Sequence, residues 1–165
     1  MHIAIVYYSQ SGNCDFVANE IAKQIDAEIV RIEPEKAYPD KGYKKFFWGG
    51  KSAVMGESPK LVPYTFDASG YDAIILGYPV WAGTFAPPIR SFVEQNRGVI
   101  AEKPVLAFAT SSGGNAEKSF VKLAALLKKD KISPTLSLVD PLVKPSDDKL
   151  AAIEAFCLQI KELNA

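Results

Sequence analysis

The chain has 165 residues, of which 48% are apolar and 23% are charged, which is typical of one globular domain rather than a disordered chain. Nineteen Lys and Arg residues balance nineteen Asp and Glu residues, and this zero net charge argues against a nucleic-acid-binding surface. The sequence contains no apolar run long enough to span a membrane and no visible signal peptide, so we expect no membrane association. Two cysteines without a CxxC spacing favour a reduced, cytoplasmic protein.

Strand-like and helix-like segments alternate along the chain. The strand-like segments are residues 3–8, 27–32, 71–77, 105–109 and 136–139. Apolar residues at helical spacing follow the first, third, fourth and fifth of them, and the last helix should begin near Ser146 or Asp147. Because parallel neighbours need long crossovers, this alternation predicts a single doubly wound α/β domain over residues 1–165, with a five-stranded parallel sheet and helices on both faces.

Residues 33–69 form one irregular stretch that is too long for a simple connection and is rich in aromatic residues such as Tyr38 and Trp48. One interpretation is a helix that packs a ragged aromatic face against the sheet, and the other is a lid or partner surface beside a ligand site. Residues 49–52 read GGKS, like the end of a Walker motif. The position of its first glycine is Lys45, so the sequence does not support nucleotide hydrolysis.

The loop after the first strand combines neutral hydrogen-bond donors with the start of a helix. In sheets of this kind, ligands bind beyond the carboxyl ends of the strands. The loop consists of Ser9, Gln10, Ser11, Gly12, Asn13 and Cys14. Free N–H groups and the dipole at a helix N-terminus favour an anion, so these residues are candidates for holding a phosphate. They are also ordinary turn and capping residues, and the pattern alone leaves both interpretations open.

The loops after the third and fourth strands are uncharged. Residues 77–88 place Trp81 where a planar heteroaromatic ligand would cover it, although packing on a neighbouring helix or subunit would also bury this side chain. Residues 110–115 are rich in small donors and glycine, which allows the backbone to approach a flat ring closely. Residues 78–88 and 110–116 contain no Asp or Glu, so we expect little negative charge around a ligand that binds between these loops.

Three motifs together resemble the flavodoxin-like proteins, in particular a short-chain group with a P-[IV]-W-x-G-T segment after the third strand. The motifs are SQSGN at 9–13, PVWAGT at 79–84 and TSSGG at 110–114, and the resemblance covers essentially the whole chain. The resemblance implies a sheet of strand order 2-1-3-4-5 and noncovalently bound FMN. We predict no catalytic residue and no metal ligand, since His2 is the only histidine and precedes the first strand.

The resemblance also implies where FMN lies. The phosphate would bind to the first loop, at Ser9, Gln10, Ser11, Gly12, Asn13 and Cys14. The isoalloxazine ring would lie along Pro79, Val80, Trp81, Ala82, Gly83 and Thr84. Its pyrimidine edge would lie along Thr110, Ser111, Ser112, Gly113 and Gly114. Cys14 and Ala82 depart from the family pattern: Cys14 replaces a threonine donor, and Ala82 leaves the second face of the ring more open.

The resemblance predicts a redox protein, of which two versions are open. One is an electron carrier that serves a redox partner protein, and the other is an FMN-dependent NAD(P)H reductase of quinones or similar small-molecule acceptors. A phospho-acceptor receiver on the same fold would need acidic residues where this chain has Ser9, Gln10, Gly77 and Tyr78. A degenerate domain without cofactor is a further alternative. The sequence leaves the oligomeric state open.

Overall fold

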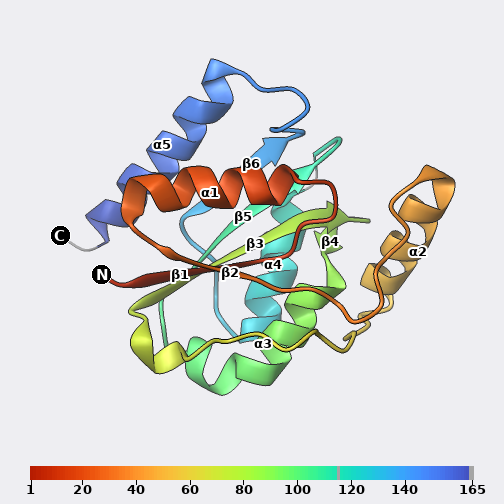
Figure 1. Cartoon of the computed structure of the whole chain (residues 1–165). Helices are drawn as coiled ribbons and strands as arrows, with labels where there is room; N and C mark the ends of the chain where they lie inside the picture. Colours follow the sequence, from red (N-terminus) through yellow and green to blue (C-terminus); the bar gives the residue numbers. More distant parts are fainter. Residues whose placement is uncertain (115, 164–165) are drawn as a thin grey trace.

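The computed structural model describes residues 1–114 and 116–163, with the side chains of residues 42, 43, 45 and 46 left out. Asn115, the last residue of the third predicted loop, therefore lies outside the described residues. The chain forms a central sheet between two layers of helices (Figure 1). None of the helices in the described ranges is both long and apolar enough to cross a membrane.

The sheet has five parallel strands and one short antiparallel strand. The parallel strands are β1 (Ile3–Tyr7), β2 (Glu28–Arg31), β3 (Ala73–Trp81), β5 (Val105–Ser111) and β6 (Thr135–Val139). They lie in the order β2-β1-β3-β5-β6, which confirms the predicted order 2-1-3-4-5 once the strands are counted without β4. Strand β4 (Thr84–Phe85), which the sequence analysis missed, pairs antiparallel with the end of β3.

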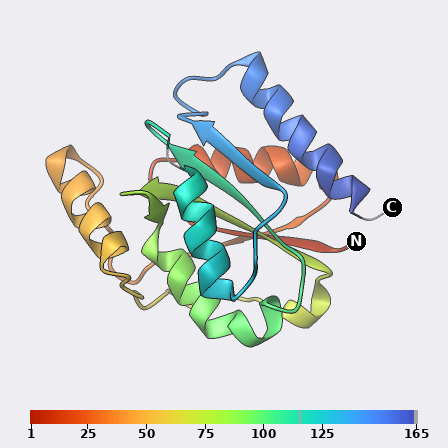
Figure 2. The ribbon, with the colours of Figure 1, turned by 180° about the vertical axis from the view of Figure 1, so that it is seen from behind.

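Helices cover both faces of the sheet (Figures 1 and 2). Helices α1 (Asn13–Ile25) and α5 (Asp147–Glu162) pack on one face, and α3 (Pro87–Ile100) and α4 (Ala116–Leu127) pack on the other. Alternate residues of the central strands enter the two cores, as period-two strand geometry requires: Ile5 faces α1 and α5, whereas Val6 faces α3 and α4. This double coverage explains why the central strands read as continuous apolar runs.

The last helix begins as predicted, but two of its leucines do not face the core. Ser146 caps α5, because its side-chain oxygen accepts a hydrogen bond from the backbone N–H of Lys149. The helical spacing of Leu150 and Leu163 with Ile153 and Ile160 predicts that both leucines are buried, yet both are exposed. They lie at the two ends of the helix, beyond the stretch from Ile153 to Ile160 that packs on the sheet.

Strand β3 is longer than the sequence indicated, because it continues through Pro79 and Val80 to Trp81 instead of ending at Gly77. Proline has no N–H to donate to a ladder, which made this segment look like a loop. Pro79 is tolerated because it lies past the last pair that β3 forms with β1, Tyr7 with Gly77. On its other side β3 continues to pair with β5 as far as Pro79.

Residues 33–69 contain a helix, but this helix does not pack on a face of the sheet. Helix α2 (Gly42–Val54) stands beside the β3–β4 hairpin, at the right of Figure 1, followed by a short 3-10 turn, η1 (Ala68–Gly70). Its Phe47 and Trp48 side chains are 59% and 49% exposed. The predicted aromatic face against the sheet is therefore wrong at these two residues, and α2 lies where the second interpretation placed a lid or partner surface.

Candidate functional site

A cavity of about 490 Å³ opens at the carboxyl edge of the parallel strands, where the three predicted loops converge. This volume lies within the range of ~300–1,000 Å³ that is usual for small-molecule and cofactor sites. The predicted residues that line the cavity are Gln10, Ser11, Asn13, residues 79–83 and residues 110–114. Ser9, Gly12, Cys14 and Thr84 do not line it. The two residues that sequence reasoning missed are Gly50 and Asp140.

The first loop leads into α1 with its backbone donors pointing outward from the helix end. Gly12 is the N-cap residue and has φ +89°, a left-handed conformation that glycine adopts without strain. The Ser9 hydroxyl accepts a hydrogen bond from the N–H of Asp15 at 3.3 Å. Within the described residues, no acceptor meets the N–H groups of Asn13 and Cys14. These free donors, together with the helix dipole, make the loop suitable for an anion.

Ser9, Cys14 and Thr84 are buried and do not line the cavity. Cys14 is 1% exposed, and its Sγ lies 3.1 Å from the hydroxyl oxygen of Thr110, so it joins the first loop to the third. Burial raises the pKa of the Cys14 thiol to about 12, which keeps it protonated at neutral pH. Cys14 is therefore a packing residue that steadies the wall. Its backbone N–H remains available to a ligand, whereas its side chain does not.

Gln10 contributes a buried polar atom that has no partner within the described chain. Its Nε2 donates a hydrogen bond of 2.8 Å to the carbonyl of Pro39, which ties the first loop to the segment before α2. Its Oε1 is buried and accepts no hydrogen bond. An unpaired buried acceptor costs free energy, about 1–3 kcal/mol, so a ligand hydroxyl or N–H that reached it would bind favourably. This observation fits a polyhydroxylated ligand.

The hairpin between β3 and β4 is a tight turn over Ala82 and Gly83. Both residues have positive φ, +49° and +70°, as a two-residue turn of type I′ requires. For Ala82, which carries a Cβ, this conformation costs of order 1–2 kcal/mol. A Cβ added at Gly83 would meet no atom within 4 Å, so this backbone borders open space at the cavity mouth.

Trp81 packs on a neighbouring helix and also lines the cavity. Its six-membered ring lies against α2, where a Cβ added at Gly49 would come within 3.2 Å of it. Tyr38 and Tyr8 meet the indole edge-on at centroid distances of 5.0 and 5.8 Å. Trp81 still lines the cavity. Packing on a neighbouring helix is therefore confirmed, and it fixes the orientation of the ring that faces the cavity.

Asp140 is a negatively charged residue at the cavity that we did not predict. It follows β6, has φ +40°, and its Oδ1 accepts a hydrogen bond of 3.3 Å from the Ser112 hydroxyl. Its Oδ2 lies 3.6 Å from Nζ of Lys144, which offsets part of its charge. The expected low negative charge around the ligand rests on the second and third loops, which contain no Asp or Glu, whereas Asp140 follows the last strand. The same rule about carboxyl ends, applied to the last strand, would have found Asp140.

Gly50 reaches the cavity because the glycine pair on α2 allows close packing. A Cβ added at Gly50 would lie 3.6 Å from the Cβ of Ala82, and Gly49 is buried against Trp81. The sequence signal for this contact is the Gly-Gly pair itself, which also resembles the end of a Walker motif. Within the described residues, no group of three His, Cys, Asp or Glu side chains is arranged to hold a metal ion.

Known proteins share both the sequence pattern and the fold. The family model described as Flavodoxin matches residues 2–137. The crystal structure of a flavoprotein in complex with FMN from Lactobacillus acidophilus has a TM-score of 0.69 and 25% identity, and the match covers 84% of this chain and 91% of that one. A flavodoxin from the domain Archaea has a TM-score of 0.62 and 15% identity, with 98% and 97% coverage.

A third similar structure belongs to a larger protein, the rubredoxin oxygen:oxidoreductase of Desulfovibrio gigas. Its TM-score is 0.63 at 12% identity, and the match covers 98% of this chain but 35% of that one. The second and third likenesses support the fold alone. The match of the family model over residues 2–137, together with the parallel sheet and the cavity at its carboxyl edge, shows that the chain belongs to the flavodoxin family.

Proposed function

We propose that this protein is an FMN-binding electron carrier whose cofactor lies in the cavity at the carboxyl edge of the sheet. The observation that carries the proposal is the composition of the cavity wall: neutral donors at a helix N-terminus on one side, and Trp81 with glycine-rich loops on the other. The expected cofactor, FMN, is confirmed by the family and by the FMN complex of the Lactobacillus acidophilus flavoprotein. When bound, FMN supplies the one- and two-electron redox chemistry.

The residues fit FMN in three parts. The phosphate would accept hydrogen bonds from the N–H groups of Asn13 and Cys14 and from the Ser11 hydroxyl. The ribityl hydroxyls would meet the unpaired Oε1 of Gln10. The ring would lie between Trp81 and the third loop, where Gly113 and Gly114 leave the backbone accessible. This division leaves the ring nearest to α2 and the hairpin, and the phosphate nearest to α1.

A partner would approach beside α2. Its Phe47 and Trp48 are exposed, its Gly50 lines the cavity, and large apolar side chains that remain exposed are typical of docking surfaces. The helix contains three lysines and no acidic residue, which favours an acidic partner protein over a basic one. We place the protein in the cytoplasm, in line with its two buried free cysteines. A small-molecule acceptor is the alternative if the protein acts as a reductase.

Anaerobic reduction of the FMN-loaded protein tests the carrier against the reductase. We expect NADPH or NADH alone to leave the visible flavin absorbance unchanged. A catalytic amount of a flavodoxin-reducing enzyme, added with NADPH, should bleach it. Rapid bleaching by either nucleotide without a partner, followed by reoxidation with a soluble quinone, would overturn the carrier assignment and establish the reductase. A protein that retains no FMN after gel filtration would overturn both.

Replacing Trp81 with alanine should weaken FMN binding and relieve fluorescence quenching. Stacking of a base on an aromatic side chain is worth ~1–3 kcal/mol, so we expect the Kd for FMN to rise by about one order of magnitude. Trp48→Ala is the matched control, because Trp48 lies on α2 but does not line the cavity. Fluorescence titration of both variants provides the measurement. Equal behaviour of the two variants would show that Trp81 is a packing residue only.

A further inference from the structure

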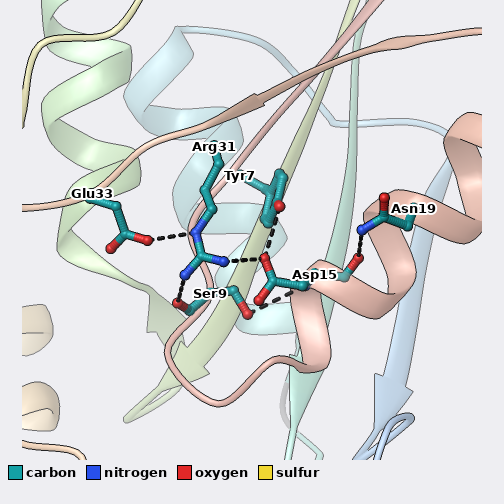
Figure 3. A network of polar contacts seen from close by, with 6 residues as sticks. All are labelled: Tyr7, Ser9, Asp15, Asn19, Arg31 and Glu33. Atoms are coloured by element: carbon teal, nitrogen blue, oxygen red, sulfur yellow. Dashed lines mark hydrogen bonds and ion pairs between the residues drawn. The ribbon is translucent and has the colours of Figure 1, made fainter.

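A charged network lies directly behind the first loop, outside the cavity wall (Figure 3). Arg31, at the end of β2, places its guanidinium between two carboxylates. Its Nη1 lies 2.6 Å from Oδ1 of Asp15, and its Nε lies 2.5 Å from Oε1 of Glu33. Its Nη2 donates a hydrogen bond of 3.3 Å to the carbonyl of Ser9, the first residue of the loop. Arg31 therefore connects the end of β2 to the first loop and to the first turn of α1.

Asp15 lies at the end of the helix where an anion is expected to bind. It is in the first turn of α1, one residue after the free N–H of Cys14, and its own N–H is bonded to the Ser9 hydroxyl. Its Oδ1 accepts a second hydrogen bond, of 2.8 Å, from the hydroxyl of Tyr7. Burial and the bond to Asp15 raise the pKa of Tyr7, so this hydroxyl stays protonated and remains a donor. Asp15 is thus held in place by a cation and a neutral donor.

A carboxylate in the first turn stabilises a helix by itself but opposes a second anion at the same end. Without Arg31, the phosphate would face the charges of both Asp15 and Glu33. With Arg31, one cation between two anions leaves a net charge of −1. We propose that Arg31 is a positioning residue that gives the first loop its preference for a phosphate-bearing flavin, because it cancels the charge of Asp15. This inference rests on the proposed function, in which the FMN phosphate lies on the first loop.

The exposure of the pair separates this role from a purely structural one. The side chains of Arg31 and Asp15 are 44% and 28% exposed, and partly exposed ion pairs contribute little to folding stability. Loss of Arg31 should therefore change the selectivity for a charged ligand much more than it changes the unfolding temperature. Riboflavin is the suitable probe, because it has the ring and ribityl chain of FMN but no phosphate.

The test compares the dissociation constants of FMN and riboflavin in the apoprotein and three variants, measured by fluorescence titration at low salt. In Arg31→Gln, we expect the preference for FMN over riboflavin to fall roughly thirtyfold, which corresponds to unit charges taken as about 8 Å apart at an effective dielectric constant of about 20. In Asp15→Asn, the preference should stay the same or rise. In the double variant, the cluster again carries the charge of the wild type, so the preference should return.

Salt and a second ion pair provide the controls. At about 1 M salt, where the Debye length is about 3 Å, the differences between variants should largely disappear. Lys23→Gln breaks the pair between Lys23 and Glu20, 2.5 Å apart on the same helix but away from the loop, and should leave the preference unchanged. Thermal unfolding of each apoprotein checks that the fold persists.

The outcomes separate the placement of the phosphate from the role of Arg31. Equal affinity of the wild type for FMN and riboflavin would contradict the placement of the phosphate, and with it the proposed function. A wild-type preference for FMN that Arg31→Gln leaves intact would overturn the role of Arg31 alone. A double variant that stays as unselective as Arg31→Gln would also overturn it, because Arg31 would then act through its bond to the Ser9 carbonyl rather than through charge.

Discussion

Replacing Gly12 with aspartate should lower the affinity for FMN by roughly two orders of magnitude, because like charges brought into contact cost several kcal/mol. Gly12 is the N-cap of α1, and its neighbours Ser11 and Asn13 line the cavity. A carboxylate at this position would place a negative charge between two residues that line the cavity and would compete with the phosphate for the free N–H groups of the helix. Titration with FMN measures the change, and circular dichroism checks that the fold persists.

Gly12→Asn is the matched control for this prediction. Asparagine has the shape of aspartate, tolerates the left-handed conformation and carries no charge. Both variants share the same steric cost, since a Cβ at Gly12 would lie 3.0 Å from Cδ2 of Leu142. The difference between them therefore isolates the charge. If the two variants bind FMN with equal affinity, the phosphate does not lie at this helix end.

Gly77→Ala should destabilise the fold by about 3 kcal/mol, at the upper end of what overpacking in a core costs. The ring of Phe108 lies across Gly77, and an added Cβ would come within 2.1 Å of its Cζ. Phe108 is fully buried between the sheet and the α1–α5 layer, so it has no room to move away. Urea unfolding of the apoprotein gives the change in free energy.

Shortening the opposing side chain should recover much of the loss. In the double variant Gly77→Ala with Phe108→Leu, the alanine methyl fills space that the ring has left, so the two effects should not add. Gly98→Ala is the control, because Gly98 lies in α3 with no atom within 4 Å of an added Cβ. It should be neutral or slightly stabilising. Simple additivity at positions 77 and 108 would contradict the close contact.

The fold could be predicted because its central strands are continuous apolar runs. Residues 3–7 and 73–77 are buried on both faces, which requires apolar runs without alternation, and such runs separated by helices leave few topologies. The three loops could be located because they follow β1, β3 and β5, each of which is an apolar run. Their convergence on one cavity then follows from parallel geometry rather than from any single motif.

The remaining features depend on contacts between segments that are distant in sequence. The extension of β3 through Pro79 is allowed only because β1 ends earlier, and no local pattern records this. The packing of Trp81 on Gly49 depends on where α2 stands. Asp140 and Arg31 act on the site from the ends of other strands, as single charged residues without a motif. A sequence pattern finds loops more readily than it finds the residues that surround them.

The most direct measurement of the central claim is a comparison of amide shifts in the ¹⁵N-labelled apoprotein on addition of FMN and of riboflavin. We expect FMN to shift the amides of Asn13 and Cys14 strongly and riboflavin to shift them little. Both ligands should shift the amides of Gly83 and Gly113, which border the ring. Shifts gathered instead around Phe16 and Leu150, which line a smaller cavity between α1 and α5, would contradict the claim.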